Sequence, residues 1–210
     1  ERGSVTSKRK KNIEKISTQN LVNDDSNYCF GEGGAGTFSD GKLFTRSNKR
    51  GNINKILQIF VHFGANESIL TDAHPHIGTD KLPLIINAMR EKIISLGGEF
   101  YFDTRCVDFI KNEKNKVTGI VTKNTITQEQ KTFTADAVVV ATGHSAFDIY
   151  ELIGKVNPQA LEAKTFAMGV RVEHPRTLID AIQYHGQNND GILPTVEYRL
   201  TTQVDERGVY

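Results

Sequence analysis

The stretch FGEGGAGTFSDGK, residues 30–42, holds five glycines and hardly any bulky apolar side chain. A segment of this composition cannot drive folding by burying apolar surface. Its value lies in its backbone, because glycine tolerates positive φ and has no Cβ to keep another group at a distance. The glycines are denser than one tight turn requires. The stretch therefore predicts a loop that comes close to another group, and a purely structural turn is the alternative.

A second segment further along the chain complements this loop. Residues 137–141, Ala-Val-Val-Val-Ala, predict a buried strand, and the small residues Thr142 and Gly143 follow at once. Small residues at a strand end let the backbone pass close to a bound molecule. Together the two segments indicate a protein that holds a nucleotide cofactor.

Apolar periodicity places the remaining elements. Near-helical spacing predicts helices at residues 52–63 and 82–96, each ended by glycine, and two more at 146–152 and 174–182. Short alternating segments predict strands at residues 99–103, 106–111, 116–123, 130–134, 167–173 and 196–201. The chain is therefore expected to be an α/β protein.

Charge and composition exclude several classes of partner. The chain has 26 basic and 25 acidic residues, so its net charge is only +1 and no global field favours nucleic acid or a membrane surface. No apolar run approaches the roughly 20 residues that span a bilayer. The tetrad Lys8-Arg9-Lys10-Lys11 is interpreted as a solvated helix start, with phosphate contact as the alternative. We expect a small-molecule substrate, of unknown identity, as the partner.

The cysteines and histidines offer little for a metal. Cys29 and Cys106 make no disulfide framework, and both are predicted to be buried thiols in a reducing, cytoplasmic compartment. His74 and His76 flank Pro75, and no carboxylate or thiol is spaced to complete a metal site, so none is expected. His76 and His144 are weak candidates for a catalytic proton donor, and ordinary hydrogen bonding in loops is the leading alternative.

Three segments carry a resemblance to a known family. Residues 27–46, 76–82 and 169–175 resemble the bacterial "NAD(FAD)-utilising dehydrogenase" family of flavoproteins with two dinucleotide-binding domains. The resemblance implies a partial FAD/NAD(P)-binding, Rossmann-like domain over residues 1–44 and 97–150. A substrate-type α+β region would then cover residues 45–96 and 151–210. FAD is the implied cofactor of the intact protein, with weak or absent binding expected in this fragment, and NAD(P) is possible as well.

The resemblance also implies which residues bind the cofactor. Glu1 would accept hydrogen bonds from the adenosine ribose hydroxyls, and Val107 would offer its backbone to adenine. Lys42 would neutralise a phosphate or the reduced flavin, and is a weak catalytic candidate for that reason. The remaining expected contacts are Gly31, Gly33, Gly34, Ala35, Gly36, Thr37, Ser39, Ala141, Thr142 and Gly143.

One departure from the family concerns the pyrophosphate-binding fingerprint. A Gly-x-Gly-x-x-Gly motif between a strand and a helix is expected before Glu1, and residues 31–36 do not replace it because no apolar strand precedes them. The chain is therefore interpreted as a middle fragment of an FAD-dependent oxidoreductase, inactive in isolation. The alternative is a non-catalytic module that binds a nucleotide or a partner. An unpaired sheet edge is expected to favour self-association.

Overall fold

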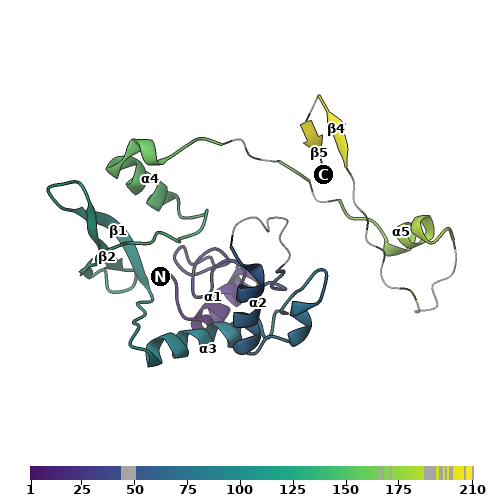
Figure 1. Ribbon diagram of the computed structural model, residues 1–210, viewed down its shortest axis with the longest axis horizontal. Helices are drawn as coiled ribbons and strands as arrows, with labels where there is room; N and C mark the ends of the chain where they lie inside the picture. Colours follow the sequence, from purple (N-terminus) through teal and green to yellow (C-terminus); the bar gives the residue numbers. More distant parts are fainter. Residues whose placement is uncertain are drawn as a thin grey trace. The chain divides into compact units, whose positions relative to one another are not determined.

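The computed structural model describes residues 1–43, 51–164, 166, 168–170, 172–186, 193, 196, 198, 201–205 and 207–209. The chain forms two compact units, Glu1–Glu162 and Ala163–Tyr210 (Figure 1). Within the described ranges no helix is both long enough and apolar enough to cross a membrane. The predicted division into residues 1–44 with 97–150, and 45–96 with 151–210, stays a prediction.

An antiparallel sheet of three strands stands at one side of the first unit (Figure 1). Strands β1 (Thr104–Lys111), β2 (Val117–Asn124) and β3 (Gln130–Thr134) follow one another as a meander. The β1–β2 turn is fixed by the Asn112 side chain, which accepts hydrogen bonds from the backbone N–H groups of Lys114 and Lys116 at 3.0 Å each. These three predicted strands are confirmed, whereas predicted strand 99–103 forms no regular element.

Two helices and a short 3₁₀ turn form the main apolar core. Helix α2 (Ile53–His62) presents a sharply apolar face, and helix α3 (Leu82–Ser95) begins with Pro83 in its first turn. The turn η1 (Glu67–Leu70) and Ile77 close the cluster. Each fully buried aliphatic side chain of this kind contributes about 1.5–3 kcal/mol. The buried members are Leu57, Ala65, Ile69, Ile77, Leu82 and Ile85.

Helix α1 (Thr6–Gln19) supports the glycine-rich stretch. The backbone of residues 30–42 takes positive φ at Gly31, Gly33 and Gly34, as the composition predicts. The stretch then pairs briefly with residues 75–78: the N–H of Leu43 donates to the carbonyl of Pro75 at 2.8 Å, and the N–H of Gly78 donates to the carbonyl of Asp40 at 2.9 Å. The C-terminal end of the loop is thereby fixed to the body of the unit.

The predicted buried strand at residues 137–141 is wrong for this structure. The segment is extended but pairs with no strand of the described chain, and Val139 is 88% exposed. A strand needs ladder partners for its backbone N–H and C=O groups, and no neighbouring strand is available to this segment. A turn follows, and then helices α4 (Phe147–Val156) and η2 (Pro158–Ala160), where Ala146 and Ile149 are buried.

The second unit contains helix α5 (Arg176–Gln183) and the hairpin of β4 (Thr202–Val204) and β5 (Arg207–Val209). The described part of the predicted strand 167–173 is extended but unpaired, and residues 167 and 171 lie outside the described residues. Residues 197, 199 and 200 of the predicted strand 196–201 also lie outside them. A mixed α/β chain is confirmed. Described strands pair only antiparallel, so they do not form the parallel sheet of a Rossmann-like domain.

Candidate functional site

A cavity of about 510 Å³ opens in the first unit between the meander, the N-terminal residues and the exposed segment 138–142. This volume lies within the roughly 300–1,000 Å³ that small-molecule sites occupy. Aromatic and aliphatic side chains form most of its wall, including Phe30, Tyr101 and Val139. Glu1 and Thr142 supply polar groups. The cavity is thus mostly apolar with a few polar groups, the usual composition of a cofactor site.

Glu1 is held in place by its backbone and by one of its carboxylate oxygens. Its backbone nitrogen donates to the carbonyl of Tyr101 at 3.0 Å, and the N–H of Thr104 donates to the Glu1 carbonyl at 2.9 Å. The side-chain Oε1 accepts from the N–H of Gly3 at 2.9 Å and from that of Gly31 at 3.0 Å. Within the described residues Oε2 has no hydrogen-bond partner, so it can accept from hydroxyl groups in the cavity.

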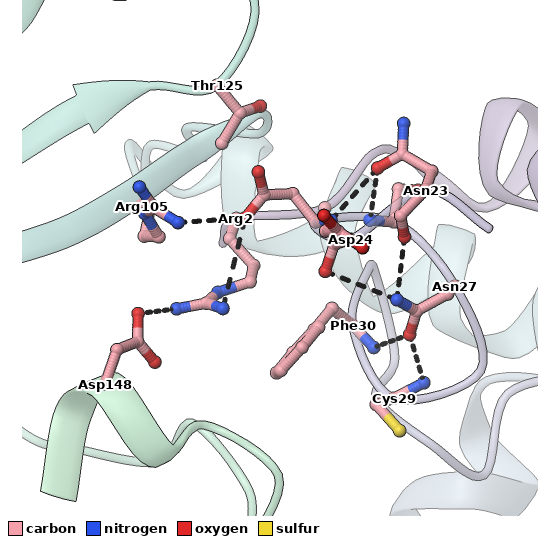
Figure 2. Close-up of polar contacts among 12 residues, drawn as sticks. Arg2, Asn23, Asp24, Asn27, Cys29, Phe30, Arg105, Thr125 and Asp148 are labelled. Atoms are coloured by element: carbon pink, nitrogen blue, oxygen red, sulfur yellow. Dashed lines mark hydrogen bonds and ion pairs between the residues drawn. The ribbon is translucent and has the colours of Figure 1, made fainter.

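Arg2 lies beside Glu1 but is engaged by other groups (Figure 2). Its guanidinium pairs with Asp148 of α4, lies 3.9 Å from Asp25, and sits over the Phe30 ring at 4.4 Å from the ring centroid. Arg105 of β1 approaches Asp25 at 3.7 Å. This cluster fixes α4 and the loop near residue 25 to the N-terminal segment, and it holds Phe30 in the cavity wall.

Arg9 contacts the glycine-rich loop from below and is fully buried. Its guanidinium donates to five acceptors of residues 27–37, and three of these distances are 2.9 Å to the Asn27 carbonyl, 2.7 Å to the Glu32 carbonyl and 3.0 Å to Thr37 Oγ1. Desolvation lowers the pKa of Arg9, although the nearby Glu1 and other groups act in the opposite sense. The interpretation of this residue as part of a solvated surface is therefore wrong, while its neighbours Lys8 and Lys10 are exposed.

Glu32 joins the loop to two helices. Its Oε2 accepts from the backbone N–H of Thr6 at 2.7 Å, which caps a helix whose own N-cap residue, Val5, offers no side-chain acceptor. Arg90 of α3 donates to both carboxylate oxygens, at 2.6 and 2.7 Å. The carboxylate is buried and fully engaged, so it acts inside the fold rather than toward a ligand.

The glycines of the loop fall into two groups, according to whether a Cβ added at the position would overlap a neighbouring side chain. A Cβ at Gly31 would overlap the Arg9 side chain, and a Cβ at Gly33 would overlap Thr37 and Ile86. Glycine is required at these two positions by the fold itself. A Cβ at Gly36 meets only Ser39 Oγ, at 3.9 Å, and its φ is not positive. The described part of the chain therefore supplies no packing reason for glycine at residue 36, where the backbone is open to a ligand.

The structure brings together some of the other predicted site residues. Ala141 and Thr142 line the cavity with Glu1, and Val107 sits at a β-bulge, without a register partner, next to the cavity-lining Cys106. Gly143 and His144 are exposed in the turn before α4.

The loop residues predicted as donors have different surroundings. The Thr37 hydroxyl is buried and bonded to Arg9 and to the carbonyls of Glu32 and Gly34. Gly34 and Ala35 are at the surface of the loop, where Ser39 donates to the Gly36 carbonyl. Lys42 forms an antiparallel β-bridge with His76, so these two catalytic candidates are direct neighbours on one face. All of these site assignments stay predictions.

The two cysteines differ, and one expectation is corrected. Cys29 is exposed, and its backbone N–H donates to Asn27 Oδ1 at 2.8 Å (Figure 2). Cys106 is half-buried at the cavity, and burial raises the pKa of its thiol. Sequence reasoning also missed Arg2, Arg9 and Phe30 as parts of the site. The only signal for them was that they adjoin Glu1, the helix start and the glycine run.

Comparison with known proteins identifies the family. Residues 37–171 match the family of FAD binding domains, and the chain belongs to it. FAD is the cofactor of this family. Residues 165–210 match a second family, described as "FAD-dependent protein, C-terminal domain-like".

Individual relatives add little beyond the family. An "Uncharacterized protein" of Clostridium beijerinckii is 40% identical over 212 residues, which cover 100% of this chain and 38% of that protein. The chain thus spans 38% of that relative's length. Among solved structures, that of the open conformation of a flavocytochrome c3 fumarate reductase is 18% identical and covers 70% of this chain and 27% of its own, at a TM-score of 0.36.

The residues at the cavity fit FAD. The ribose hydroxyls of FAD are hydrogen-bond donors, and Glu1 Oε2 is an acceptor without a protein partner in the described chain. The adenine ring is flat and apolar on its faces, and Phe30, Tyr101 and Phe109 supply aromatic walls.

Proposed function

We propose that this chain is part of an FAD-dependent oxidoreductase and that the cavity beside Glu1 receives the adenosine end of FAD. The observation that carries the proposal is the geometry of Glu1. One carboxylate oxygen is anchored by two backbone N–H groups and the other remains available at the wall of an apolar cavity. The match to FAD binding domains supports the same cofactor.

Each part of the site has its own proposed role. Glu1 accepts from the ribose hydroxyls, and the bulged backbone at Val107 bonds the edge of adenine. Gly34, Ala35 and Gly36 let the loop backbone come close to the phosphates or the flavin. Ala141 and Thr142, which line the cavity, and Gly143, which follows them in the chain, have the same proposed role. Bound FAD supplies the transfer of a hydride or of single electrons, and the protein supplies position and charge.

Lys42 and His76 are the proposed catalytic pair. Their bridge places both side chains on one face, so an imidazole and a lysine amino group are presented together. The resemblance at residues 27–46 and 76–82 supports membership of the NAD(FAD)-utilising dehydrogenases, with NADH or NADPH as reductant. This proposal includes the activity of the whole protein. The proposed substrate of the protein is a small molecule.

A flavin titration tests the proposal directly. The purified chain is titrated with FAD, and binding is followed by flavin fluorescence and by absorbance retained after desalting. Glu1→Gln keeps a carbonyl oxygen for Gly3 and Gly31 but replaces Oε2 by a donor. Loss of one charge-assisted bond costs about 1.5–3 kcal/mol, so we expect Kd to rise roughly 10- to 150-fold. Glu14→Gln, on the exposed face of α1, is the matched control and should leave Kd unchanged.

Two outcomes would contradict the proposal. A colourless chain that shows no saturable binding at any accessible FAD concentration removes the cavity as a flavin site. An unchanged Kd in Glu1→Gln removes Glu1 from it. If FAD binds, addition of NADH or NADPH under anaerobic conditions separates the alternatives: bleaching of the flavin supports an oxidoreductase, and a flavin that stays oxidised favours the non-catalytic binding module.

A further inference from the structure

The contacts of Arg9 differ from those of an ordinary buried arginine. Within the described residues it pairs with no carboxylate, and all five of its acceptors belong to residues 27–37. Four are backbone carbonyls and the fifth is the Thr37 hydroxyl. A buried cation is costly unless every N–H is satisfied, so the loop must keep these carbonyls turned inward. The conformation of the loop and the position of the Arg9 side chain therefore depend on each other.

A direct chain of contacts leads from Arg9 to the cavity. Arg9 Nη1 donates to the Gly31 carbonyl at 3.3 Å, and its aliphatic stem lies where a Cβ of Gly31 would be. The N–H of Gly31 donates in turn to Glu1 Oε1 at 3.0 Å. Phe30, which precedes Gly31, is part of the cavity wall. The position of Arg9 thus determines where Gly31 lies, and Gly31 orients the carboxylate of Glu1.

The charge of Arg9 also connects it to Glu1. Glu32, the nearest carboxylate on the loop, is turned away from Arg9 toward Thr6 and Arg90. The guanidinium of Arg9 is therefore held by neutral acceptors of the loop, and Glu1 is the first of the nearby charged groups that favour its protonated form. This attraction acts in the same direction as the contact through Gly31.

We propose that Arg9 is a positioning residue of the flavin site. It does not touch the cofactor. It holds the backbone of residues 27–37 in the shape that aims Glu1 at the ribose, a role that rests on the proposed function. Arg9 belongs to α1 and lies outside the cavity, so it acts at the cofactor only through the loop.

A double-mutant cycle on the full 210-residue chain tests the coupling. Arg9→Lys keeps the charge but loses the planar set of donors, and we expect it to weaken FAD binding about tenfold. If Arg9 acts through Glu1, the same substitution in a Glu1→Gln background should weaken binding by less than about threefold. Thr37→Val removes one contact of Arg9 and is the milder variant should Arg9→Lys unfold. Lys10→Met, exposed on the same helix, is the control and should change nothing.

A second measurement separates this proposal from the flavin assignment. Amide hydrogen exchange of residues 27–37, measured without FAD, should be at least about tenfold faster in Arg9→Lys, while α3 exchanges at the wild-type rate. Equal losses of FAD affinity in the wild-type and Glu1→Gln backgrounds would overturn the proposal. Unchanged exchange in the loop would do the same. If wild type binds no FAD but the loop exchanges faster in Arg9→Lys, the proposed function is wrong. Arg9 then stabilises the loop but has no role at a flavin site.

Discussion

Gly31 and Gly36 belong to the same loop, but different neighbours require them. Gly31 has φ of +123° and lies against the Arg9 side chain, so both conformation and space exclude a Cβ. Gly36 has neither constraint, and among the described residues a Cβ there would meet only Ser39 Oγ, at 3.9 Å. A pair of alanine variants therefore distinguishes the structural role of the loop from its role toward a ligand.

We expect Gly31→Ala to lower the free energy of unfolding by more than about 2 kcal/mol, because strain and overlap add. Gly36→Ala should leave the melting temperature within about 2 °C of wild type but raise the Kd for FAD. Thermal unfolding followed by circular dichroism measures the melting temperature, and the flavin titration measures the Kd for FAD. Wild-type affinity in Gly36→Ala would show that no cofactor approaches the loop at this residue.

The thiols give an independent probe of the cavity. Burial raises the pKa of Cys106 above its ordinary value of 9.0, so its reactive thiolate is scarce at pH 8. We expect iodoacetamide to alkylate the exposed Cys29 first, and FAD to slow Cys106 further because Cys106 lines the cavity. Peptide mass spectrometry over a pH series measures both rates. Protection of Cys29 rather than Cys106 by FAD would place the cofactor elsewhere.

The same pKa predicts a direction for stability. The folded chain holds the Cys106 proton more tightly than the unfolded chain does. The contribution of this thiol to the free energy of unfolding is therefore complete below the unfolded pKa. It is lost as the pH rises from that value through the higher folded pKa.

At the scale of elements, Glu32 connects three parts of the first unit. It caps α1 through Thr6, pairs with Arg90 of α3, and belongs to the glycine-rich loop. Because these contacts converge on one carboxylate, its removal should loosen all three elements together rather than one.

We expect Glu32→Gln to lower the free energy of unfolding by about 1–3 kcal/mol, since the amide can still accept one bond but no longer balances Arg90. Chemical denaturation measures the change. Glu113→Gln, in the exposed β1–β2 turn, is the control. A loss confined to local exchange in the loop, with global stability unchanged, would contradict the connecting role.

Elements with local signals could be predicted from sequence, and contacts between elements could not. Apolar periodicity identified α2 and α3, and turn residues identified the β1–β2 hairpin. Composition also identified residues 30–42 as a loop with positive φ. Arg9 was misjudged because a basic tetrad looks the same whether its members face water or one of them lies beneath a loop. The strand at 137–141 failed because strand formation depends on partners elsewhere in the fold.

At the scale of the whole chain, several large apolar side chains on unpaired segments are exposed. Val139 is 88% exposed in the first unit, and in the second unit Phe166, Met168 and Val170 are each more than 80% exposed. Alternating apolar side chains on unpaired, extended backbone are a template for pairing with another chain.

We therefore propose that the chain self-associates, and we expect sedimentation velocity to show a mass that rises with concentration. Val139→Lys should shift the distribution toward monomer, because a charge on an open edge opposes pairing. Ile126→Lys, at an exposed turn, serves as the control. A single monomeric species over a hundredfold range of concentration would contradict this prediction.

The contact between Arg9 and Gly31 limits how this sequence can change over evolutionary time. A side chain at residue 31 has no room while the arginine is present, and loss of the arginine takes from the Asn27 and Tyr28 carbonyls the donor that they have among the described residues. A substitution at residue 9 or at residue 31 alone is therefore expected to destabilise the loop. Among related sequences that share this loop, residues 9 and 31 are therefore expected to be retained together or replaced together, although 22 positions separate them.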